Sequence, residues 1–317
     1  MADRRPIFVF LDHDLFGVLI ANGVIPRLIA QGYDPVIYNG RNGRNTTPRV
    51  PHPDLSKLFN NGLLDRVILP CLDAQDPRDL RALSPARLAA THGVGYVEIG
   101  DPNHADIPAQ VAACGAAYAG AVSFRFSQVF RAPLVAFMQQ QGFFWNMHSG
   151  LLPEYKGLLT LYPAFWDGAT HYGMTLHEMA VGIDAGAVID QVKRPFTPHT
   201  PVFDLYLATV PGAIDMLTHH TALMQRQGTT RRCPQTGDPA AGYYTNPTTQ
   251  EFNRAAQAGL IYADVARMPR LLANLFAKGG TPAHRTLEQR LTSDLRPHQN
   301  DPRLKLPQTH RTPQCVA

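Results

Sequence analysis

The stretch PIFVFLDHDLFGVLIANGVIPRLIAQGYDPVIY, residues 6–38, alternates two kinds of apolar pattern. Residues 6–11 form a continuous apolar run of the length of a buried strand, and residues 15–31 have the spacing of an amphipathic helix that ends before Gly32. A second apolar run at residues 35–38 predicts another strand. This order predicts a right-handed βαβ unit, in which the two strands are parallel.

The same alternation continues through the first half of the chain. Further strands are expected at residues 66–69, 95–99, 121–126, 143–147, 174–179 and 187–192, and helices at residues 107–117 and 133–140. We therefore expect an α/β domain over residues 1–205, with a Rossmann-like, mostly parallel twisted sheet and helices on both faces.

The pattern changes after about residue 205. Long helical segments are expected at residues 203–227 and 252–276, on either side of a stretch rich in Pro, Gly, Thr and Tyr. Residues 282–317 contain five prolines and little apolar periodicity, which predicts a loosely attached or disordered tail. Residues 206–317 are therefore expected to form a smaller helical extension. Apolar patches in residues 206–276 could form a homodimer surface or pack onto the first domain, and the sequence does not decide between these alternatives.

Composition narrows the classes of partner. The 317 residues are 44% hydrophobic, enough for one sizeable core, and the formal net charge of +4 gives no argument for nucleic acid or an anionic membrane. The four cysteines are far apart and form no CxxC pair, so neither a disulfide framework nor a cysteine-rich zinc site is predicted. Because no apolar run approaches about 18 residues, we expect a soluble cytoplasmic protein with no membrane partner.

Three polar residues are candidates for catalysis at one edge of the predicted sheet. Asn146 and His148 end the strand at residues 143–147, and their spacing of two puts both side chains on the same side. An amide N–H and an imidazolium N–H both suit an oxygen that becomes negative during acyl transfer to an amine. Asp184, after the strand at residues 174–179, could return to this edge, remove the proton of the amine and hold His148 in its charged form.

Two segments resemble a known family. NMHSGLLPEYKG at residues 146–157 and GMTLHEMAVGIDAGAVI at residues 173–189 look like the signature of the folate-dependent formyltransferases, which include the glycinamide ribonucleotide and methionyl-tRNA formyltransferases. The matching positions are Asn146, His148, Leu151, Leu152, Pro153, Gly157, Gly173, Thr175, His177, Asp184 and Gly186. The resemblance covers residues 95–195 and implies that 10-formyltetrahydrofolate is the formyl donor, that Asn146, His148 and Asp184 are catalytic, and that no metal is needed.

The resemblance also implies a place for the folate donor. AVSFRFSQVF at residues 121–130 is similar to the segment that lines the family's folate pocket, so Arg125 and Phe126 are expected to border the pterin. Ala180 and Ile183 are expected to form the opposite wall. The chain departs from the family pattern at Gly150, where a serine is usual. It also departs at LDHDLFG, residues 11–17, which replaces a glycine-rich phosphate turn and argues against glycinamide ribonucleotide as the acceptor.

Several alternatives stay open. The preferred acceptor is a small amine, such as an amino sugar nucleotide or a hydroxyornithine-like amine. Methionyl-tRNA formyltransferase is the second choice, with tRNA as the one nucleic-acid partner considered, and a formyltetrahydrofolate deformylase is another. A metal site built from His148, His177 and Asp184 and an inactive folate-binding scaffold are weaker candidates. His177 could orient the catalytic groups or simply form a hydrogen bond inside the fold.

Overall fold

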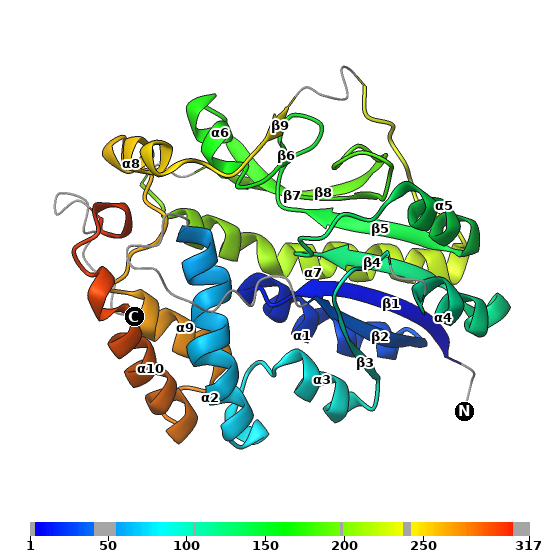
Figure 1. The fold of residues 1–317 in the computed structure, drawn as a ribbon, viewed down its shortest axis with the longest axis horizontal. Coiled ribbons are helices and arrows are strands. Elements are labelled where there is room, and N and C mark those ends of the chain that lie inside the picture. The colour runs from blue at the N-terminus through cyan, green and yellow to red at the C-terminus, as the bar shows by residue number, and fades with distance from the viewer. Residues whose placement is uncertain (1–3, 41–54, 104–105, 197–198, 237–241, 307–317) are drawn as a thin grey trace.

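The central feature of the computed structural model is a seven-stranded sheet (Figure 1). The structure describes residues 4–40, 55–103, 106–196, 199–236 and 242–306. Its strand order is β3-β2-β1-β4-β5-β7-β8, where β1 to β5 are parallel and β7 and β8 are antiparallel to their neighbours. The strands are β1 (Arg5–Asp12), β2 (Tyr33–Gly40), β3 (Gly95–Ile99), β4 (Gly120–Phe124), β5 (Phe143–His148), β7 (His171–Glu178) and β8 (Val188–Pro195). The expected mostly parallel, Rossmann-like sheet is confirmed.

Helices cover both faces of the sheet because its inner strands are apolar on both sides. In β1, Ile7, Val9 and Leu11 belong to one hydrophobic cluster, and Phe8 and Phe10 belong to the other. The first cluster packs under α1 (Leu15–Ala30), α3 (Pro85–His92) and α7 (Val202–Gln227), and the second under α4 (Asp106–Cys114) and α5 (Ala132–Gln141). The sheet thus lies between two helical layers, as α/β architecture requires.

The expected strand at residues 66–69 is wrong, because this run is part of a helical rod. Residues Lys57–Gly62 (η1) and Leu64–Ile68 (η2) form π-helical turns that continue into α2 (Leu69–Ala74). Its buried side chains recur every three or four residues; they include Leu58, Leu64, Val67, Ile68, Cys71 and Leu72. A four-residue apolar window has the same appearance in a strand and in a buried helix, and here only the longer window separates them.

The expected helix at residues 252–276 is two helices, α8 (Thr249–Gln257) and α9 (Met268–Phe276). Gly259, at φ 95°, takes the backbone out of the helical region after α8. The segment that follows is buried, and the carbonyl groups of Ile261 and Tyr262 accept hydrogen bonds from the N–H groups of Val202 and Phe203. These two hydrogen bonds satisfy two of the unpaired N–H groups at the start of α7. The interruption between α8 and α9 therefore lets this segment pack against the start of α7.

The expectation of a loosely attached segment from residue 282 is wrong as far as the structure describes the chain. Pro282–Leu295 forms α10, which Thr281 caps by accepting a hydrogen bond from the His284 N–H at 3.2 Å. Leu287, Leu291 and Leu295 are buried, and α10 packs beside α9 and α2 (Figure 1). Pro282 occupies the first helical turn, where its missing N–H costs nothing. Residues 307–317 lie outside the described part.

The remaining elements are short. They are η3 (Pro77–Asp79), η4 (Gly115–Ala117), β6 (Lys156–Gly157), α6 (Leu161–Trp166), β9 (Tyr243–Tyr244), η5 (Arg296–His298) and η6 (Pro302–Leu304). The division at residue 205 falls in the first turn of α7 and stays a prediction. None of the helices in the described ranges is both long and apolar enough to cross a membrane.

Replacing Leu291 by alanine tests whether α10 is part of the core. The side chain is fully buried, so Leu291→Ala is expected to lower the free energy of unfolding by about 2–5 kcal/mol. Urea denaturation followed by circular dichroism measures this change. The exposed Gln289 on the same helix provides a control, since Gln289→Ala is expected to change stability by less than about 0.5 kcal/mol. Equal stability of the two variants would show that α10 does not pack as described.

Candidate active site

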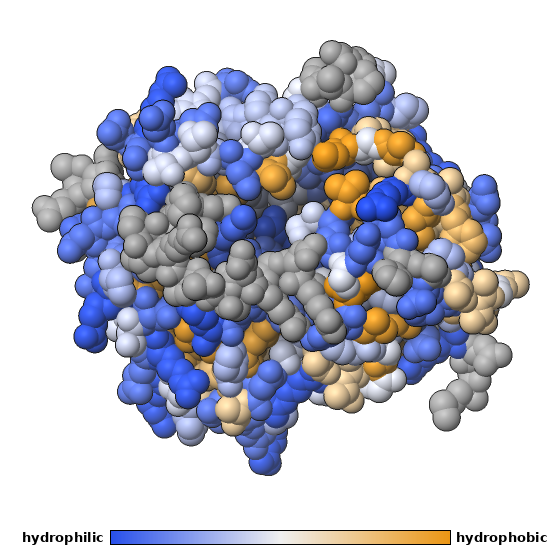
Figure 2. Space-filling view, viewed as in Figure 1, coloured by the Kyte–Doolittle hydropathy of each residue, from blue (hydrophilic) through white to orange (hydrophobic). Residues whose placement is uncertain are grey.

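Strands β5 and β7 bring Asn146, His148 and His177 together. In this antiparallel pair Asn146 is directly opposite His177, and His148 is opposite Thr175. Directly opposite residues point to the same face of a sheet, so these four side chains share one face. Figure 2 shows a hollow near the middle of the molecular surface, in the region where Figure 1 places the end of β5.

Asp184 reaches the same place from the turn between β7 and β8. Its carboxylate oxygen Oδ2 lies 3.2 Å from His148 Nδ1 and accepts a hydrogen bond of 2.9 Å from the N–H of Gly157. The other oxygen, Oδ1, lies 3.5 Å from His177 Nε2 and 3.4 Å from Asn146 Nδ2. The three residues predicted to be catalytic are therefore in contact, and His177 joins them.

The surroundings of Asp184 keep it ionised. Burial raises the pKa of this carboxyl group, but the two histidines and the N–H of Gly157 more than offset burial and lower the pKa to about 2. With its side chain 9% exposed, the group is a nearly buried negative charge at neutral pH.

His148 faces acceptors on both sides of its ring. Burial lowers the pKa of His148 below its ordinary 6.5, and the attraction of Asp184 acts against burial without overcoming it, so the expectation that Asp184 holds the ring in its charged form is wrong for the site without substrate. The ring atom Nε2 lies 2.7 Å from the carbonyl oxygen of Tyr155, and Nδ1 faces Asp184. A neutral ring donates to only one of these oxygen atoms. His148 therefore gains a second hydrogen bond when it takes up a proton.

His177 orients Asn146 and also forms a hydrogen bond within the fold. Its Nδ1 lies 2.7 Å from the carbonyl oxygen of Glu178, which can only accept, so Nδ1 carries a proton. In the neutral ring Nε2 then accepts from Asn146 Nδ2 at 3.1 Å. The second N–H of Asn146 makes a weaker contact, at 3.4 Å from Asp184. At this N–H a substrate oxygen could take the place of the carboxylate.

The loop between β5 and β6 sets the distance between His148 and Tyr155. A methyl group added at Gly150 would lie 2.5 Å from the Tyr155 carbonyl oxygen and 2.6 Å from His148 Nε2. The glycine that replaces the family's serine therefore makes room for this hydrogen bond. Thr175 fixes the loop, because its hydroxyl donates to Gly150 O at 2.7 Å and accepts from Leu152 N at 3.1 Å.

The residues expected to border a folate lie on two segments beside this cluster. Arg125 makes two hydrogen bonds to the carboxylate of Asp14, at 2.9 and 2.7 Å, and a third to Ser149 Oγ at 3.1 Å. Phe126 stacks on Phe130 with ring centroids 5.3 Å apart. On the Asp184 turn, Ala180 is half-buried and Ile183 is 48% exposed. Folate binding by these four residues, Arg125, Phe126, Ala180 and Ile183, stays a prediction.

Sequence reasoning missed two contributions to the site. Gln235 donates hydrogen bonds to the backbone of the Asp184 turn, and nothing in its Pro- and Gly-rich surroundings indicated this contact. Asp14 was visible as an acid just before the apolar helix at residues 15–31, the usual position of an N-cap, but its pairing with Arg125 was not. Lys156 lies where β6 pairs with β9 and is only 3% exposed.

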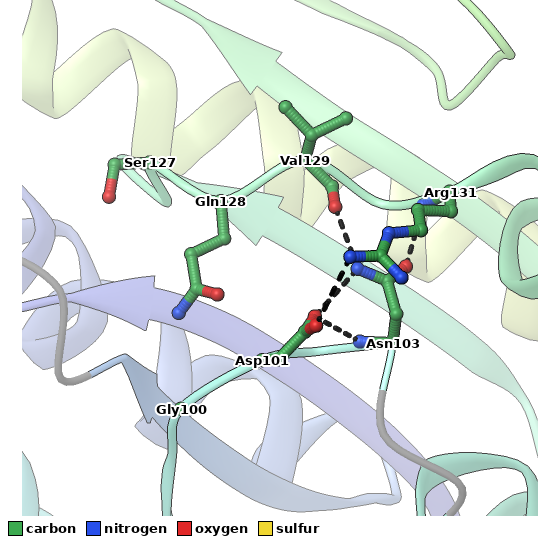
Figure 3. A pocket seen from close by; sticks show the side chains of 7 residues that line it. All are labelled: Gly100, Asp101, Asn103, Ser127, Gln128, Val129 and Arg131. Carbon is green, nitrogen blue, oxygen red and sulfur yellow. Dashed lines mark hydrogen bonds and ion pairs between the residues drawn. The ribbon is translucent and has the colours of Figure 1, made fainter.

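A separate cleft of about 570 Å³ lies beyond the ends of β3 and β4 (Figure 3). It is lined by Gly100, Asp101, Asn103, Ser127, Gln128, Val129 and Arg131. Its polar groups bind one another, since Asn103 Nδ2 donates to Asp101 at 2.7 Å and Arg131 N donates to Asn103 Oδ1 at 2.6 Å. The cleft shares no residue with the Asn146 cluster, and the second of these hydrogen bonds joins the loop after β3 to the loop after β4. Within the described ranges no group of three or more His, Cys, Asp or Glu side chains could hold a metal ion.

The lowered pKa of Asp184 predicts a pH-dependent contribution to stability. A carboxyl group whose folded pKa is about 2, below its ordinary 3.8, stabilises the fold above pH 3.8 and loses this effect as the pH falls through 2. The difference in free energy of unfolding between wild type and Asp184→Asn should therefore shrink by about 2 kcal/mol between pH 5 and pH 2. Denaturant titrations at several pH values measure it, and a constant difference would contradict the pairing described.

Comparisons with known proteins find formyl transferases. Residues 102–210 match the family model described as formyl transferase. The methionyl-tRNA formyltransferase of Burkholderia orbicola (strain MC0-3) is 28% identical over 93 residues, which is 29% of this chain and 28% of that protein. The match thus spans less than a third of the relative's length.

Two solved structures share the fold. The glycinamide ribonucleotide transformylase 1 of Symbiobacterium toebii is 16% identical with a TM-score of 0.51, covering 75% of this chain and 96% of the other. A sugar N-formyltransferase from Shewanella sp. FDAARGOS_354 is 14% identical with a TM-score of 0.51, covering 90% and 87%. The similarity to the formyl transferase family thus covers residues 102–210, about one third of the 317 residues, and the solved structures show that the fold around this segment is shared.

Proposed function

We propose that this chain is an N-formyltransferase that moves a formyl group from 10-formyltetrahydrofolate to the amine of a small molecule. The observation that carries the proposal is the contact of Asn146, His148 and Asp184 at the end of β5. A carboxamide, an imidazole and a carboxylate are the groups that acyl transfer to an amine needs. The folate donor, which supplies an activated formyl group, is inferred from the resemblance to the folate-dependent formyltransferases and is part of the proposal.

Asn146 and His148 are proposed to stabilise the formyl oxygen as it becomes negative. Asn146 is half-buried, and the N–H that faces Asp184 at 3.4 Å can donate to this oxygen instead, while the other N–H of the same nitrogen stays bound to His177. His148 has to exchange one of its two present acceptors for the substrate oxygen. The proton transfer proposed below keeps the contact of Nδ1 with Asp184 at 3.2 Å, so the acceptor to be exchanged is the carbonyl oxygen of Tyr155, which Nε2 faces at 2.7 Å.

Asp184 is proposed to receive the proton of the attacking nitrogen and to pass it to His148. A carboxylate with a pKa of about 2 keeps a proton poorly, whereas the ring of His148 gains a hydrogen bond on protonation. As the new C–N bond forms, the amine loses one proton. When the old C–N bond breaks, the departing nitrogen gains one, so the two transfers balance.

The turn after β1 argues against an acceptor whose phosphate would sit there. The N-terminus of a helix is a natural anion site. At α1 that site is already filled by Asp14, whose carboxylate accepts from Gly17 N at 3.1 Å and pairs with Arg125. We therefore favour a small amine without a phosphate at this turn over glycinamide ribonucleotide.

Methionyl-tRNA is the second candidate acceptor, and the relative from Burkholderia orbicola favours it. The family's tRNA enzymes resemble this chain less at the C-terminus, where they carry a β-barrel. Over residues 206–236 and 242–306 the structure has helices and a two-residue strand, β9. Such a barrel would bind RNA through a basic surface on its strands. The described extension is mainly helical and does not offer a surface of that kind.

A panel of amines incubated with 10-formyltetrahydrofolate tests the proposal. Mass spectrometry is expected to show the gain of one formyl group on a small primary or hydroxylated amine. Transfer to charged initiator methionyl-tRNA alone would establish the second candidate. Release of formate at full rate without any amine would make the protein a hydrolase and overturn the proposal.

Alanine variants test the assigned roles. Asn146→Ala and His148→Ala are each expected to lower kcat by about 100-fold to 1000-fold, since each removes a donor to the oxyanion. The exposed His171, at the far end of β7, supplies a matched control, and His171→Ala should keep wild-type kcat. Circular dichroism establishes that the variants fold. A folded His148→Ala enzyme with near-normal turnover would remove His148 from the mechanism.

A further inference from the structure

A segment from the C-terminal region lies along the turn that carries Asp184. Cys233 and Val188 exchange two backbone hydrogen bonds of 2.8 and 2.7 Å, which add a short antiparallel bridge beside β8. Next to it, Arg232 Nε lies 2.9 Å from the carboxylate of Glu178 at the end of β7. The segment thus contacts the chain on both sides of the turn at residues 179–187.

Gln235 makes the contact nearest to the catalytic cluster. Its Nε2 donates to the carbonyl oxygens of Asp184 and Gly186, each at 2.7 Å. Carbonyl oxygens can only accept, so the amide nitrogen has to face them, and this fixes the orientation of the side chain. Both N–H bonds of the amide are used on one turn.

The turn needs such a support because its backbone is unusual at Asp184. Asp184 has φ 51°, in the left-handed region that residues with a side chain rarely adopt. Gly186 is pressed against β7, where an added methyl group would lie 1.8 Å from the carbonyl oxygen of Glu178. The backbone conformation at Asp184 aims its carboxylate at His148, so a relaxed turn would move the carboxylate.

We infer that Gln235 is a positioning residue that holds the Asp184 backbone in the conformation needed for the proton transfer. The inference rests on the proposed function. Gln235 fixes the main chain of Asp184, while Gly157 N fixes its side chain at 2.9 Å. Gly157 is in turn paired with Tyr244 of β9. Residues 232–236 and 242–244 therefore hold the catalytic carboxylate from two directions, which gives the C-terminal region a role in the reaction.

Gln235→Ala is the first test. Loss of the two hydrogen bonds is expected to lower kcat by about 10-fold to 100-fold, the effect of a displacement of about 1 Å, while KM for donor and amine stays within about twofold. Gln31→Ala is the matched control, because Gln31 also donates to a backbone carbonyl, that of Thr218 at 2.8 Å, on the α1–α7 side of the sheet. It is expected to lower stability and to leave kcat unchanged.

Gln235→Glu gives a readout that a purely structural role would not produce. An ionised glutamate would face two carbonyl oxygens and be repelled by them, whereas the protonated form can donate to one of them. The ratio of variant to wild-type kcat is therefore expected to fall as the pH rises. A ratio independent of pH, or a Gln235→Ala enzyme with wild-type kcat, would overturn the inference.

The two levels of proposal fail differently. If Asp184→Asn is inactive and Gln235→Ala is fully active, the proposed function stands and the role of Gln235 is wrong. If a folded Asp184→Asn enzyme turns over normally, the proposed use of Asp184 fails and the inference fails with it. Loss of kcat in Gln235→Ala together with equal loss in Gln31→Ala would show a general effect of destabilisation and would also count against Gln235.

Discussion

The site depends on a buried negative charge, the carboxylate of Asp184. Removing a carboxylate from water costs several kcal/mol unless its oxygens are paired. Here the N–H of Gly157 in β6 and the side chains of His148 and Asn146 in β5 supply those partners, while His177 of β7 holds Asn146, so three separate segments meet around one side chain. The contacts that stabilise the local fold also set the charge of the groups proposed to act on the amine. A substitution that removes one of these contacts is therefore expected to change both the stability and the charge.

The sequence predicts most of the sheet and the central residues of the site for physical reasons. Strands with apolar residues on both faces and helices with a three-to-four spacing are strong signals. The spacing of Asn146 and His148 implies a shared face, which the structure confirms. The position of His177 opposite Asn146 depends on the register of β5 and β7, a long-range property that no local pattern carries.

The errors also have physical causes. The apolar run at residues 66–69 is too short to show whether its period is that of a strand or of a helix. In residues 282–317 the five prolines indicated an irregular segment, although Leu287, Leu291 and Leu295 have the spacing of a helix. One of those prolines begins the helix. Gln235 could not be found from sequence, because its role depends on a turn 50 residues away, at Asp184 and Gly186. Contacts of this kind follow from tertiary packing, which local propensity does not encode.

The charges around β1 and β5 bear on which acceptor the domain can take. Arg125 and the N-terminus of α1 are both positive features that could hold an anion, and Asp14 neutralises both at once. Arg125 also donates to Ser149, next to His148, so this neutral arrangement is connected to the strand end where the residues proposed to be catalytic lie. A phosphate entering here would have to displace a nearly buried carboxylate from a bidentate ion pair. An amine approaching Asp184 meets no such barrier, because its positive or partly positive N–H groups are attracted to the ionised carboxylate. Under the proposed function, the charges at this edge of the sheet therefore favour the amine nucleophile and disfavour an acceptor that carries a phosphate at the turn after β1.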